Sequence, residues 1–410
     1  MPEFFHVLPP AAARALLFEH LAWRTPAETI ATAQAPGRVT ATPIFAPHAL
    51  PTFRRSTMDG YAVRAADTHG ASGALPALLQ VVGEVPMGQP AALALRPGQA
   101  VIVHTGGMLP HSADAVVQVE HTQPAGAQEI EVVRAVAAGQ NVLQVGEDVA
   151  QGAQILPAGH VLRPQDLGGL LALGLTEVVV AQRPRVAILA TGDEVVPPDA
   201  PAGPGQIRDI NSYTVAGQVQ QAGGLPCLGG ILPDHLPALQ EAAAVALAGS
   251  DMLVMSAGSS VSVRDMTVQV IDGLGSPGVL LHGVATRPGK PTIVGVVQGK
   301  PVLGLPGNPV SAMIQFDMFG VPAIYRLQGA AQTPRRAVVY ARLAHNLASE
   351  TGREDYVPTR LEETAEGLVA RPVFGKSNLI YTLVHADGLI KIPLNKGGIP
   401  AGELVEVRLF

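Results

Sequence analysis

The sequence lacks the cysteines that a disulfide framework or a thiolate metal site requires, because Cys227 is the only one in 410 residues. A single cysteine excludes an internal disulfide and any cysteine-rich zinc or iron–sulfur site, and it is typical of a reducing compartment. The N-terminal segment carries Glu3 and several prolines where a secretory signal needs a basic and then an apolar stretch. We therefore expect a cytoplasmic protein in which Cys227 packs in a core.

Charge and long apolar runs are also scarce. Charged residues make up 15% of the chain, and the net charge of −6 comes without any basic cluster, so nucleic-acid binding is not expected. The most apolar stretch, residues 167–181, is interrupted by glycines and Glu177. It falls short of the roughly 20 residues that span a bilayer, so we expect no membrane segment.

Several catalytic signatures are absent as well. The twelve histidines show no HExxH or comparable ligand spacing, and the chain has neither a GxSxG turn nor a P-loop. Acyl transfer by a serine nucleophile and nucleotide hydrolysis of the P-loop kind therefore have no support in the sequence.

Apolar residues, at 47%, and turn residues, with 45 glycines and 36 prolines, are plentiful and interspersed. A chain of this length predicts about two to four domains. Helical spacing over residues 11–23 precedes a Pro-rich stretch over 25–51, and short strand patterns with Gly/Pro turns fill 52–138. A short helix after Pro164 and a strand over 177–181 follow, and we expect that strand to pair with the Pro-rich stretch.

Strand and helix patterns alternate from Arg183 onward, which predicts a doubly wound α/β domain. After Gly329 the pattern returns to strands without helical interruption, which predicts a small barrel or sandwich. The elements expected in the α/β domain are strands over 185–190, 225–231 and 251–256 and helices over 211–222 and 235–248.

The predicted fold class is therefore a multidomain α/β plus β protein. It has a doubly wound α/β domain, two flanking β-rich domains and an elongated, discontinuous linker domain. The expected boundaries are 1–50 with 141–182 for the linker domain, 51–140 for the first β-rich domain, 183–329 for the α/β domain and 330–410 for the C-terminal β-barrel.

The block RVAILATGDE is the strongest local signal. Its buried strand runs directly into Thr191, Gly192, Asp193 and Glu194. Open α/β sheets bind ligands at the carboxyl ends of their strands. Adjacent carboxylates can hold Mg²⁺ through oxygen and leave room for substrate phosphates, although a turn with two solvated acids is the alternative.

Two further acids follow strands of the same domain. Asp234 comes after the second strand and Asp265 after the third, so both should project to the rim that holds Glu194. Three carboxylates on one rim predict a metal site.

Two loops of this domain offer groups for an anion. In residues 205–212, Asn211 or Ser212 can cap a helix with Arg208 just upstream, and such a helix start suits an anion. Residues 256–265, SAGSSVSVRD, form a small-residue loop whose amides could cradle a phosphate. Plain capping and an ordinary loop are the alternatives.

Two rigid Pro/Gly loops come next. One carries Arg287 and Lys290, and the other has Asn308 as a helix N-cap with Pro309 as the first helical residue. Two cations beside an exposed helix N-terminus predict an anion pocket, with solvated surface cations as the alternative.

In combination and in order, the motifs resemble the MoeA family, which includes the C-terminal domain of gephyrin, across nearly the whole chain. The matching blocks are STMDGYAV (56–63), GQAVIVHTGG (98–107), ADAVVQVE (113–120), GEDV (146–149), PRVAILATGDE (184–194), GQIRDINSY (205–213), RPGKP (287–291) and LPGNPVSA (305–312).

The resemblance implies a molybdopterin molybdenumtransferase that inserts molybdate into adenylyl-molybdopterin with Mg²⁺-dependent release of AMP. The acids that match active-site positions are Asp59, Asp148, Glu194, Asp234 and Asp265, and the last three would hold Mg²⁺. The implied substrate contacts are Thr105, Thr191, Gly192, Asp193, Arg208, Asn211, Ser212, Ser260, Pro306, Gly307 and Asn308. The implied molybdate contacts are Arg287, Lys290, Arg360 and Ser377.

The resemblance also implies an elongated homodimer. Its cleft would lie between the α/β domain of one subunit and the β region of the other, so that Asp59 would act in trans. The implied partners are a molybdopterin adenylyltransferase and molybdoenzyme apoproteins or their chaperones.

Two segments depart from the family pattern. SAGSSVSVRD stands where SGGVSVGDYD is common, and it keeps Asp265 while losing two glycines and another acid. In GREDYVPTR, Pro358 stands at a position that is usually arginine, and Arg360 follows two residues later. In GKSNL, Ser377 matches the family serine, and Lys376 beside it could substitute for the missing cation.

Three alternatives stay open. A molybdopterin adenylyltransferase would share the α/β domain type, although the flanking β regions argue against it. A non-catalytic scaffold dimer could use the same fold, and a paralogue could insert tungstate or serve a dedicated enzyme.

Overall fold

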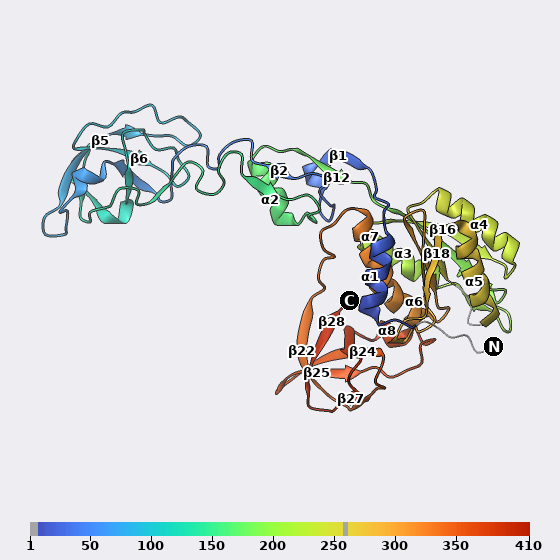
Figure 1. Cartoon of the computed structure of the whole chain (residues 1–410). Coiled ribbons are helices and arrows are strands. Elements are labelled where there is room, and N and C mark those ends of the chain that lie inside the picture. Colours follow the sequence, from blue (N-terminus) through green and yellow to red (C-terminus); the bar gives the residue numbers. More distant parts are fainter. Residues whose placement is uncertain (1–6, 257–260) are drawn as a thin grey trace. The chain divides into compact units, whose positions relative to one another are not determined.

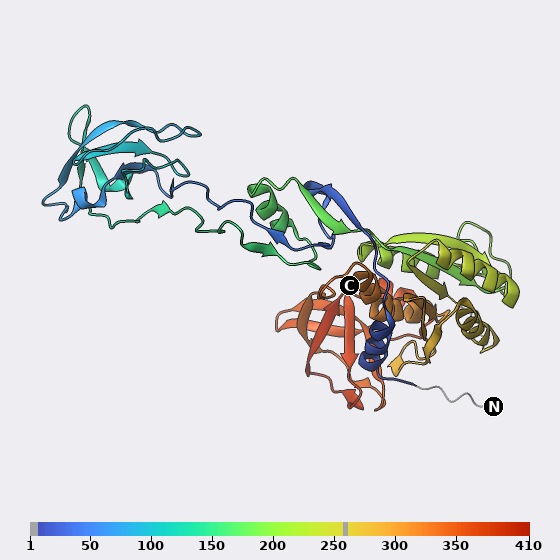
Figure 2. The ribbon, with the colours of Figure 1, turned by 45° about the horizontal axis from the view of Figure 1, so that its top comes forward.

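The computed structural model describes residues 7–256 and 261–410, and for residues 261–265 it describes only the backbone (Figures 1 and 2). The chain divides into two compact units. The larger unit comprises Met1–Thr42, Ala158–Leu167 and Glu177–Phe410, and the smaller unit comprises Pro43–Pro157 and Gly168–Thr176. The expected boundaries of four domains stay a prediction.

A six-stranded sheet lies in the larger unit, in the order β16-β13-β17-β21-β20-β18. The first four strands run parallel, and β20 pairs antiparallel with both β21 and β18. Both β13 and β17 are buried along almost their whole length, which explains their continuous apolar sequences. The strands are Arg185–Thr191 (β13), Leu225–Leu232 (β16), Met252–Ser256 (β17), Pro277–His282 (β18), Ile293–Val297 (β20) and Lys300–Leu305 (β21).

Helices cover both faces of this sheet, as Figure 1 shows, which confirms the predicted doubly wound α/β arrangement. On one face lie α4 (Leu236–Ala248) and α5 (Val261–Leu274). On the other lie α1 (Pro10–His20), α3 (Asn211–Gln221) and α6 (Pro309–Gln315), and α6 continues through a π-helical segment (Phe316–Gly320) into α7 (Val321–Leu327).

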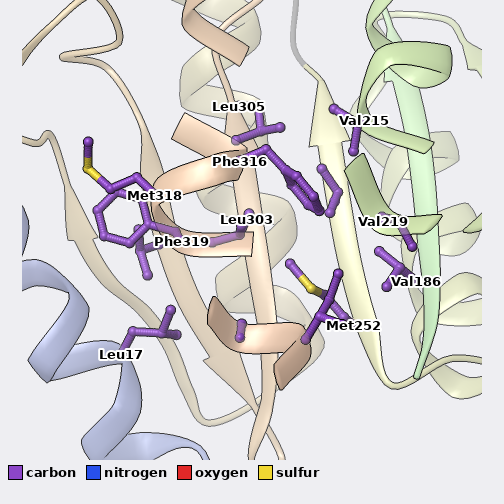
Figure 3. Packing of buried hydrophobic residues seen from close by; sticks show 14 of the residues in the cluster. Leu17, Val186, Val215, Val219, Met252, Leu303, Leu305, Phe316, Met318 and Phe319 are labelled. Atoms are coloured by element: carbon purple, nitrogen blue, oxygen red, sulfur yellow. The ribbon is translucent and has the colours of Figure 1, made fainter. Parts of the chain in front are cut away.

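Alternate residues of β13 pack into two different hydrophobic clusters. Val186 contributes to the cluster under α1, α3 and α6, whereas Leu189 contributes to the cluster under α4 and α5. Figure 3 shows the first cluster, in which the fully buried rings of Phe316 and Phe319 lie near Met252 and Leu303. Burial of each such side chain stabilises the fold by roughly 1.5–3 kcal/mol. The cluster therefore fixes α3 and α6 on the sheet.

The C-terminal region forms a closed barrel, as predicted. Its strands follow the order β24-β25-β22-β28-β26, and β24 also pairs with β26. A short strand of the preceding region, β19 (Thr286–Arg287), adds in parallel to β24. The barrel strands are β22 (Val338–Leu343), β24 (Glu354–Thr364), β25 (Gly367–Pro372), β26 (Gly388–Ile392) and β28 (Leu404–Leu409), with a side pair of β23 (Leu347–Ala348) and β27 (Gly398–Ile399).

The prediction that no helix interrupts this region is wrong. A short helix, α8 (Tyr381–Val384), precedes β26. Its Leu383 is buried against Val310, Ile314 and Leu389, so tertiary packing accounts for a helix that is too short to give a periodic sequence pattern.

The strand β12 (Glu177–Ala181) pairs antiparallel with β1 (Ala27–Ala31), which confirms the predicted return of this segment to the Pro-rich stretch. The helix expected after Pro164 is α2 (Pro164–Ala172). Across residues 7–256 and 261–410, no helix has the length and hydropathy that crossing a membrane requires.

The smaller unit contains a second six-stranded sheet, in the order β7-β4-β6-β5-β9-β8. Residues 119–121 form a 3₁₀ turn directly after β7, and β9 ends at Val132. The strands are β4 (Gly60–Val63), β5 (Ala77–Glu84), β6 (Gln99–Val103), β7 (Ala115–Gln118), β8 (Thr122–Pro124) and β9 (Glu129–Val132), with the short pairs β2 (Ile44–Phe45) with β11 (Gln154–Leu156) and β3 (Arg55–Ser56) with β10 (Val142–Leu143).

Candidate functional site

Three acids lie together at the carboxyl ends of β13 and β16. The backbone N–H of Asp234 donates to Asp193 Oδ1 at 3.1 Å. Glu194 folds back over Gly192, where a Cβ would lie 2.8 Å from Glu194 Oε2. Gly192 has a φ of +141°, a backbone conformation that favours glycine at this turn. Burial, followed by the charges of Asp193 and Glu194, raises the pKa of Asp234.

Two of the three predicted Mg²⁺ ligands fit a divalent cation. Asp234 Oδ1 is buried without a hydrogen-bond partner among the described residues, and a cation would both pair with this oxygen and offset the repulsion from Glu194. Asp265 belongs to α5, but its side chain is outside the described part of the chain. Within that part, no three His, Cys, Asp or Glu side chains form a ready set of metal ligands.

The start of α3 differs from the prediction that Asn211 or Ser212 caps it. Asp209 Oδ1 instead accepts a hydrogen bond from the backbone N–H of Ser212 at 3.1 Å. The Asn211 amide is engaged elsewhere, because it donates to Ser256 Oγ at 2.9 Å and to the Gly307 carbonyl at 2.8 Å. Asn211 therefore ties α3 to the ends of β17 and β21 rather than capping its own helix.

Polar atoms at this edge are left available to a ligand. Asn211 Oδ1 and Ser212 Oγ are buried without hydrogen-bond partners in the described part of the chain, and such atoms cost free energy unless something pairs with them. Thr191 is buried beside them, with its hydroxyl 3.5 Å from the Ser256 carbonyl.

One predicted substrate contact among the described residues, Arg208, is not brought to this group. Arg208 is exposed on β15 (Ile207–Arg208), which pairs with β14 (Val195–Val196), and its Nε donates to the Pro198 carbonyl at 3.0 Å. Ser260 lies outside the described residues.

A cleft of about 950 Å³ opens between the α/β sheet region and the barrel of the larger unit. The residues that line it include five predicted site residues: Arg287, Lys290, Pro306, Asn308 and Ser377. Arg360, the fourth predicted molybdate contact, is not among the lining residues; it is exposed on β24, opposite Arg371 of β25.

Asn308 connects two walls of this cleft. The helix α6 begins at Pro309 as predicted, but Asn308 makes no side-chain cap. Its amide instead donates to Ser377 Oγ at 3.0 Å, and the Ser377 carbonyl accepts from the N–H of Val310 at 3.1 Å. The segment that carries Ser377 is thereby held against the start of α6.

Gln315, which the sequence analysis missed, holds the loop that carries the two predicted cations. Its side chain is completely buried and donates to Thr286 Oγ1 at 3.0 Å and to the Pro288 carbonyl at 2.9 Å. A Cβ at Gly289 would overlap this amide, so the loop can lie on Gln315 only with glycine there.

The charge balance of the cleft lining is positive. The lining cations are Arg287, Lys290, Arg353 and Lys376, whereas Asp355 is the one carboxylate among the lining residues. Asp355 accepts from Arg353 Nε at 2.9 Å and lies 3.9 Å from a terminal nitrogen of Arg287. Such a cleft favours an anionic ligand.

The smaller unit carries the remaining predicted acids. Asp59 Oδ1 accepts from the N–H of Thr105 at 2.8 Å, which brings these two predicted residues together. His104, which the sequence analysis missed, lies 3.8 Å from the same oxygen and 2.9 Å from Glu84 Oε1. Asp148 is exposed on another loop, with its backbone N–H bound to the Leu50 carbonyl.

Three successive regions of the chain match known protein families. Residues 8–174 match the MoeA N-terminal region (domain I and II), residues 187–326 a probable molybdopterin binding domain, and residues 340–410 the MoeA C-terminal region (domain IV). The class defined by this order of domains is that of the multidomain proteins of molybdopterin biosynthesis.

Relatives and solved structures agree with these matches. The molybdopterin molybdenumtransferase of Nostoc sp. is 36% identical over 378 residues, which cover 90% of this chain and 86% of the relative. Molybdopterin molybdenumtransferase 2 of Mycobacterium tuberculosis is 33% identical over 92% of this chain and 94% of its own. The crystal structure of the molybdopterin biosynthesis MoeA protein of Pyrococcus horikoshii OT3 is 32% identical with a TM-score of 0.85, covering 98% of this chain and all of that one. The chain belongs to the MoeA family.

Proposed function

We propose that the protein is a molybdopterin molybdenumtransferase, which inserts molybdate into adenylyl-molybdopterin and releases AMP. The observation that carries this proposal is a loop shared by the two groups of site residues. The Gly307 carbonyl accepts from Asn211 at the strand ends, and the next residue, Asn308, lines the cationic cleft. The polar group of Asn211 at the strand ends and a cationic cleft for an oxyanion are thus joined by adjacent residues.

Different residues bind the molybdate and the pterin substrate. Arg287 and Lys290 attract molybdate, a dianion, and Ser377 offers it a hydroxyl donor, so the oxyanion is held where the dithiolene sulfurs of the pterin replace its oxygens. Asn211 and Ser212 offer the substrate the polar atoms that have no partner in the described part of the chain.

The acidic residues act at the phosphoanhydride bond that is cleaved. Water attacks the pyrophosphate link of adenylyl-molybdopterin, the phosphoanhydride bond breaks, and AMP leaves as the product. Glu194 and Asp234, with Asp265, would hold Mg²⁺ beside that link. When bound, the ion neutralises charge that develops on the phosphate oxygens.

We also infer a cytoplasmic homodimer in which Asp59 of one subunit completes the site of the other. In support, Asp59 is 65% exposed in the side chain yet is oriented by the Thr105 N–H, so it is a fixed carboxylate free to meet another surface. An adenylyltransferase must supply the substrate, and molybdoenzyme apoproteins or their chaperones must accept the product.

Turnover in vitro tests this function. The purified protein is incubated with adenylyl-molybdopterin, Mg²⁺ and molybdate, and AMP release and cofactor formation are followed together. We expect both to require the protein and molybdate. A parallel reaction with tungstate measures the preference between the two oxyanions. Absence of molybdate-dependent AMP release would contradict the proposal.

A further inference from the structure

We infer that Lys376 binds the oxyanion in the cleft, in the role that the sequence assigns to Arg360. This inference rests on the proposed function, because it names a further contact of the same site. Lys376 is one of the lining residues of the cleft, whereas Arg360 is not.

The position of Lys376 in the cleft wall is fixed by its neighbours. Ser377 is bound on both its hydroxyl and its carbonyl, to Asn308 and Val310. The Lys376 carbonyl accepts from the N–H of Leu379 at 3.0 Å, which closes a turn. On the other side, a Cβ at Gly375 would overlap the Thr382 side chain, so the backbone packs closely there. The backbone of Lys376 is therefore held on both sides in the wall of the cleft.

The charge of Lys376 is also uncompensated. In the part of the chain that the structure describes, no carboxylate lies within ion-pair distance of it. Arg353, by contrast, is paired with both Asp355 and Glu350, each at 2.9 Å. Arg353 therefore has little charge to offer a ligand, while Lys376 keeps its own.

The chemistry of the side chain suits a tetrahedral dianion. An ammonium group is a compact charge with three donors on a flexible stem, so it can follow an oxyanion that moves as its oxygens are replaced. Because Lys376 is exposed, salt screens its attraction for the anion, and the contribution should fall as ionic strength rises.

The test compares single substitutions in the full-length protein. Lys376→Gln keeps most of the length and removes the charge, Lys376→Arg keeps the charge, and Arg360→Gln tests the other candidate. Lys396→Gln is the matched control, because it removes a lysine of the same C-terminal region that pairs with Glu403 outside the cleft. Molybdate binding is measured by calorimetry with molybdate alone, and the molybdate concentration at half-maximal AMP release is measured separately.

We expect Lys376→Gln to raise the dissociation constant of molybdate and the molybdate concentration at half-maximal AMP release about tenfold at low salt. This effect should shrink at high salt, and the melting temperature should be unchanged. Lys376→Arg should restore most of the loss, and Lys396→Gln should behave as the wild type. A larger effect for Arg360→Gln than for Lys376→Gln, or no effect of Lys376→Gln on molybdate binding, would overturn the inference. Absence of wild-type turnover despite normal molybdate binding would instead reject the proposed function.

Discussion

At Asp234, burial and two neighbouring carboxylates act in the same direction, and both disfavour the ionised side chain. Among the described residues Oδ1 of Asp234 has no hydrogen-bond partner, so the fold retains this group at a cost in stability. A cation that pairs with Asp234 Oδ1 when substrate is present would offset this cost. The acids at Asp193, Glu194 and Asp234 are therefore better explained by ligand chemistry than by folding.

Glu194→Gln tests this explanation at a single residue. The change keeps the side-chain volume, removes one ligand charge and relieves repulsion with Asp234, so we expect Mg²⁺-dependent AMP release to be lost while the melting temperature holds or rises. Turnover is assayed across Mg²⁺ concentrations alongside thermal unfolding. Glu241→Gln, an exposed change on α4, is the control. Near-wild-type turnover at saturating Mg²⁺ would show that Glu194 is not a ligand.

Gln315 is a positioning residue, since it supports the loop of Arg287 and Lys290 and does not line the cleft. Gln315→Met keeps the volume but leaves the Thr286 hydroxyl and the Pro288 carbonyl without their donor. We expect a loss of about 1–3 kcal/mol in the free energy of unfolding and a higher molybdate concentration at half-maximal rate.

The control for this prediction is Gln328→Met. Gln328 is also buried, and its amide donates to the Ile324 carbonyl, away from the cleft lining. It should lose stability without any change in molybdate dependence. If both variants shift the molybdate dependence equally, the effect of Gln315 comes from general destabilisation.

At the scale of elements, the first turn of α2 is organised by one carboxylate. Asp166 accepts from the backbone N–H and the guanidinium of Arg163, at 2.8–3.0 Å, and lies 2.7 Å from His160 Nε2. The Arg163 hydrogen bonds, opposed by burial and supported by His160, hold the pKa of Asp166 well below its usual range. Its side chain is only 6% exposed, so solvent screens these interactions little.

Asp166→Asn should therefore destabilise the fold in a pH-dependent way. Because the folded pKa is depressed, the stabilising contribution is present above the unfolded-state pKa of about 4 and is lost as pH falls through the folded value. We expect the variant to lose about 1–3 kcal/mol equally at pH 7 and pH 5, with a smaller difference at pH 3.5. Urea unfolding measures this. A difference that grows toward low pH would contradict the assignment.

Elements with a repeating pattern could be predicted from the sequence. β13 and β17 are buried on both faces, so they appear as continuous apolar runs, and α3 and α4 have amphipathic or alanine-rich spacing with glycine at the end. α8 could not be predicted, because four residues give no period and its stability comes from packing on α6. β19 pairs with β24 far along the chain, which local sequence does not encode.

The site was predictable where a buried strand ends in acids, as at Asp193 and Glu194, and where glycines and prolines mark a loop. Those loops located Arg287, Lys290 and Asn308, which the structure brings to one cleft. The prediction that Asn211 caps its helix was wrong, because its side-chain amide donates instead to Ser256 and Gly307. Both acceptors are remote from Asn211 in the sequence. Gln315 and the His104–Glu84 pair could not be predicted for the same reason, since each depends on tertiary contacts.

At the scale of the whole molecule, the charge of the cleft lining is opposite in sign to the net charge of the chain. The chain has a net charge of −6, so an anionic substrate gains no general attraction from the protein. The positive lining of the cleft must therefore act locally, within roughly 10 Å at ordinary ionic strength. This arrangement favours anions that fit the cleft over anions in general.

The predicted acids are also divided over the molecule: Asp59 belongs to the smaller unit and Glu194 to the larger unit. If Asp59 acts in trans, each site of a homodimer needs the smaller unit of one subunit and the larger unit of the other. A dimer assembled from two different subunits can distinguish this arrangement from a site within one subunit.

We predict that Asp59→Asn and Glu194→Gln, each inactive alone, complement one another in mixed dimers. In a shared site, one cleft collects both defects and the other collects neither, so the mixed dimer should recover about half of wild-type AMP release. If Asp59 acts in cis, every cleft carries one defect and mixing restores nothing. The second pairing joins one wild-type subunit with one subunit that carries both substitutions. A shared site would then leave one defect in each cleft, so this dimer should be inactive. Two affinity tags isolate the mixed dimers, and mass spectrometry confirms their composition. Activity in the second pairing, with none in the first, would place Asp59 and Glu194 in the same subunit's site.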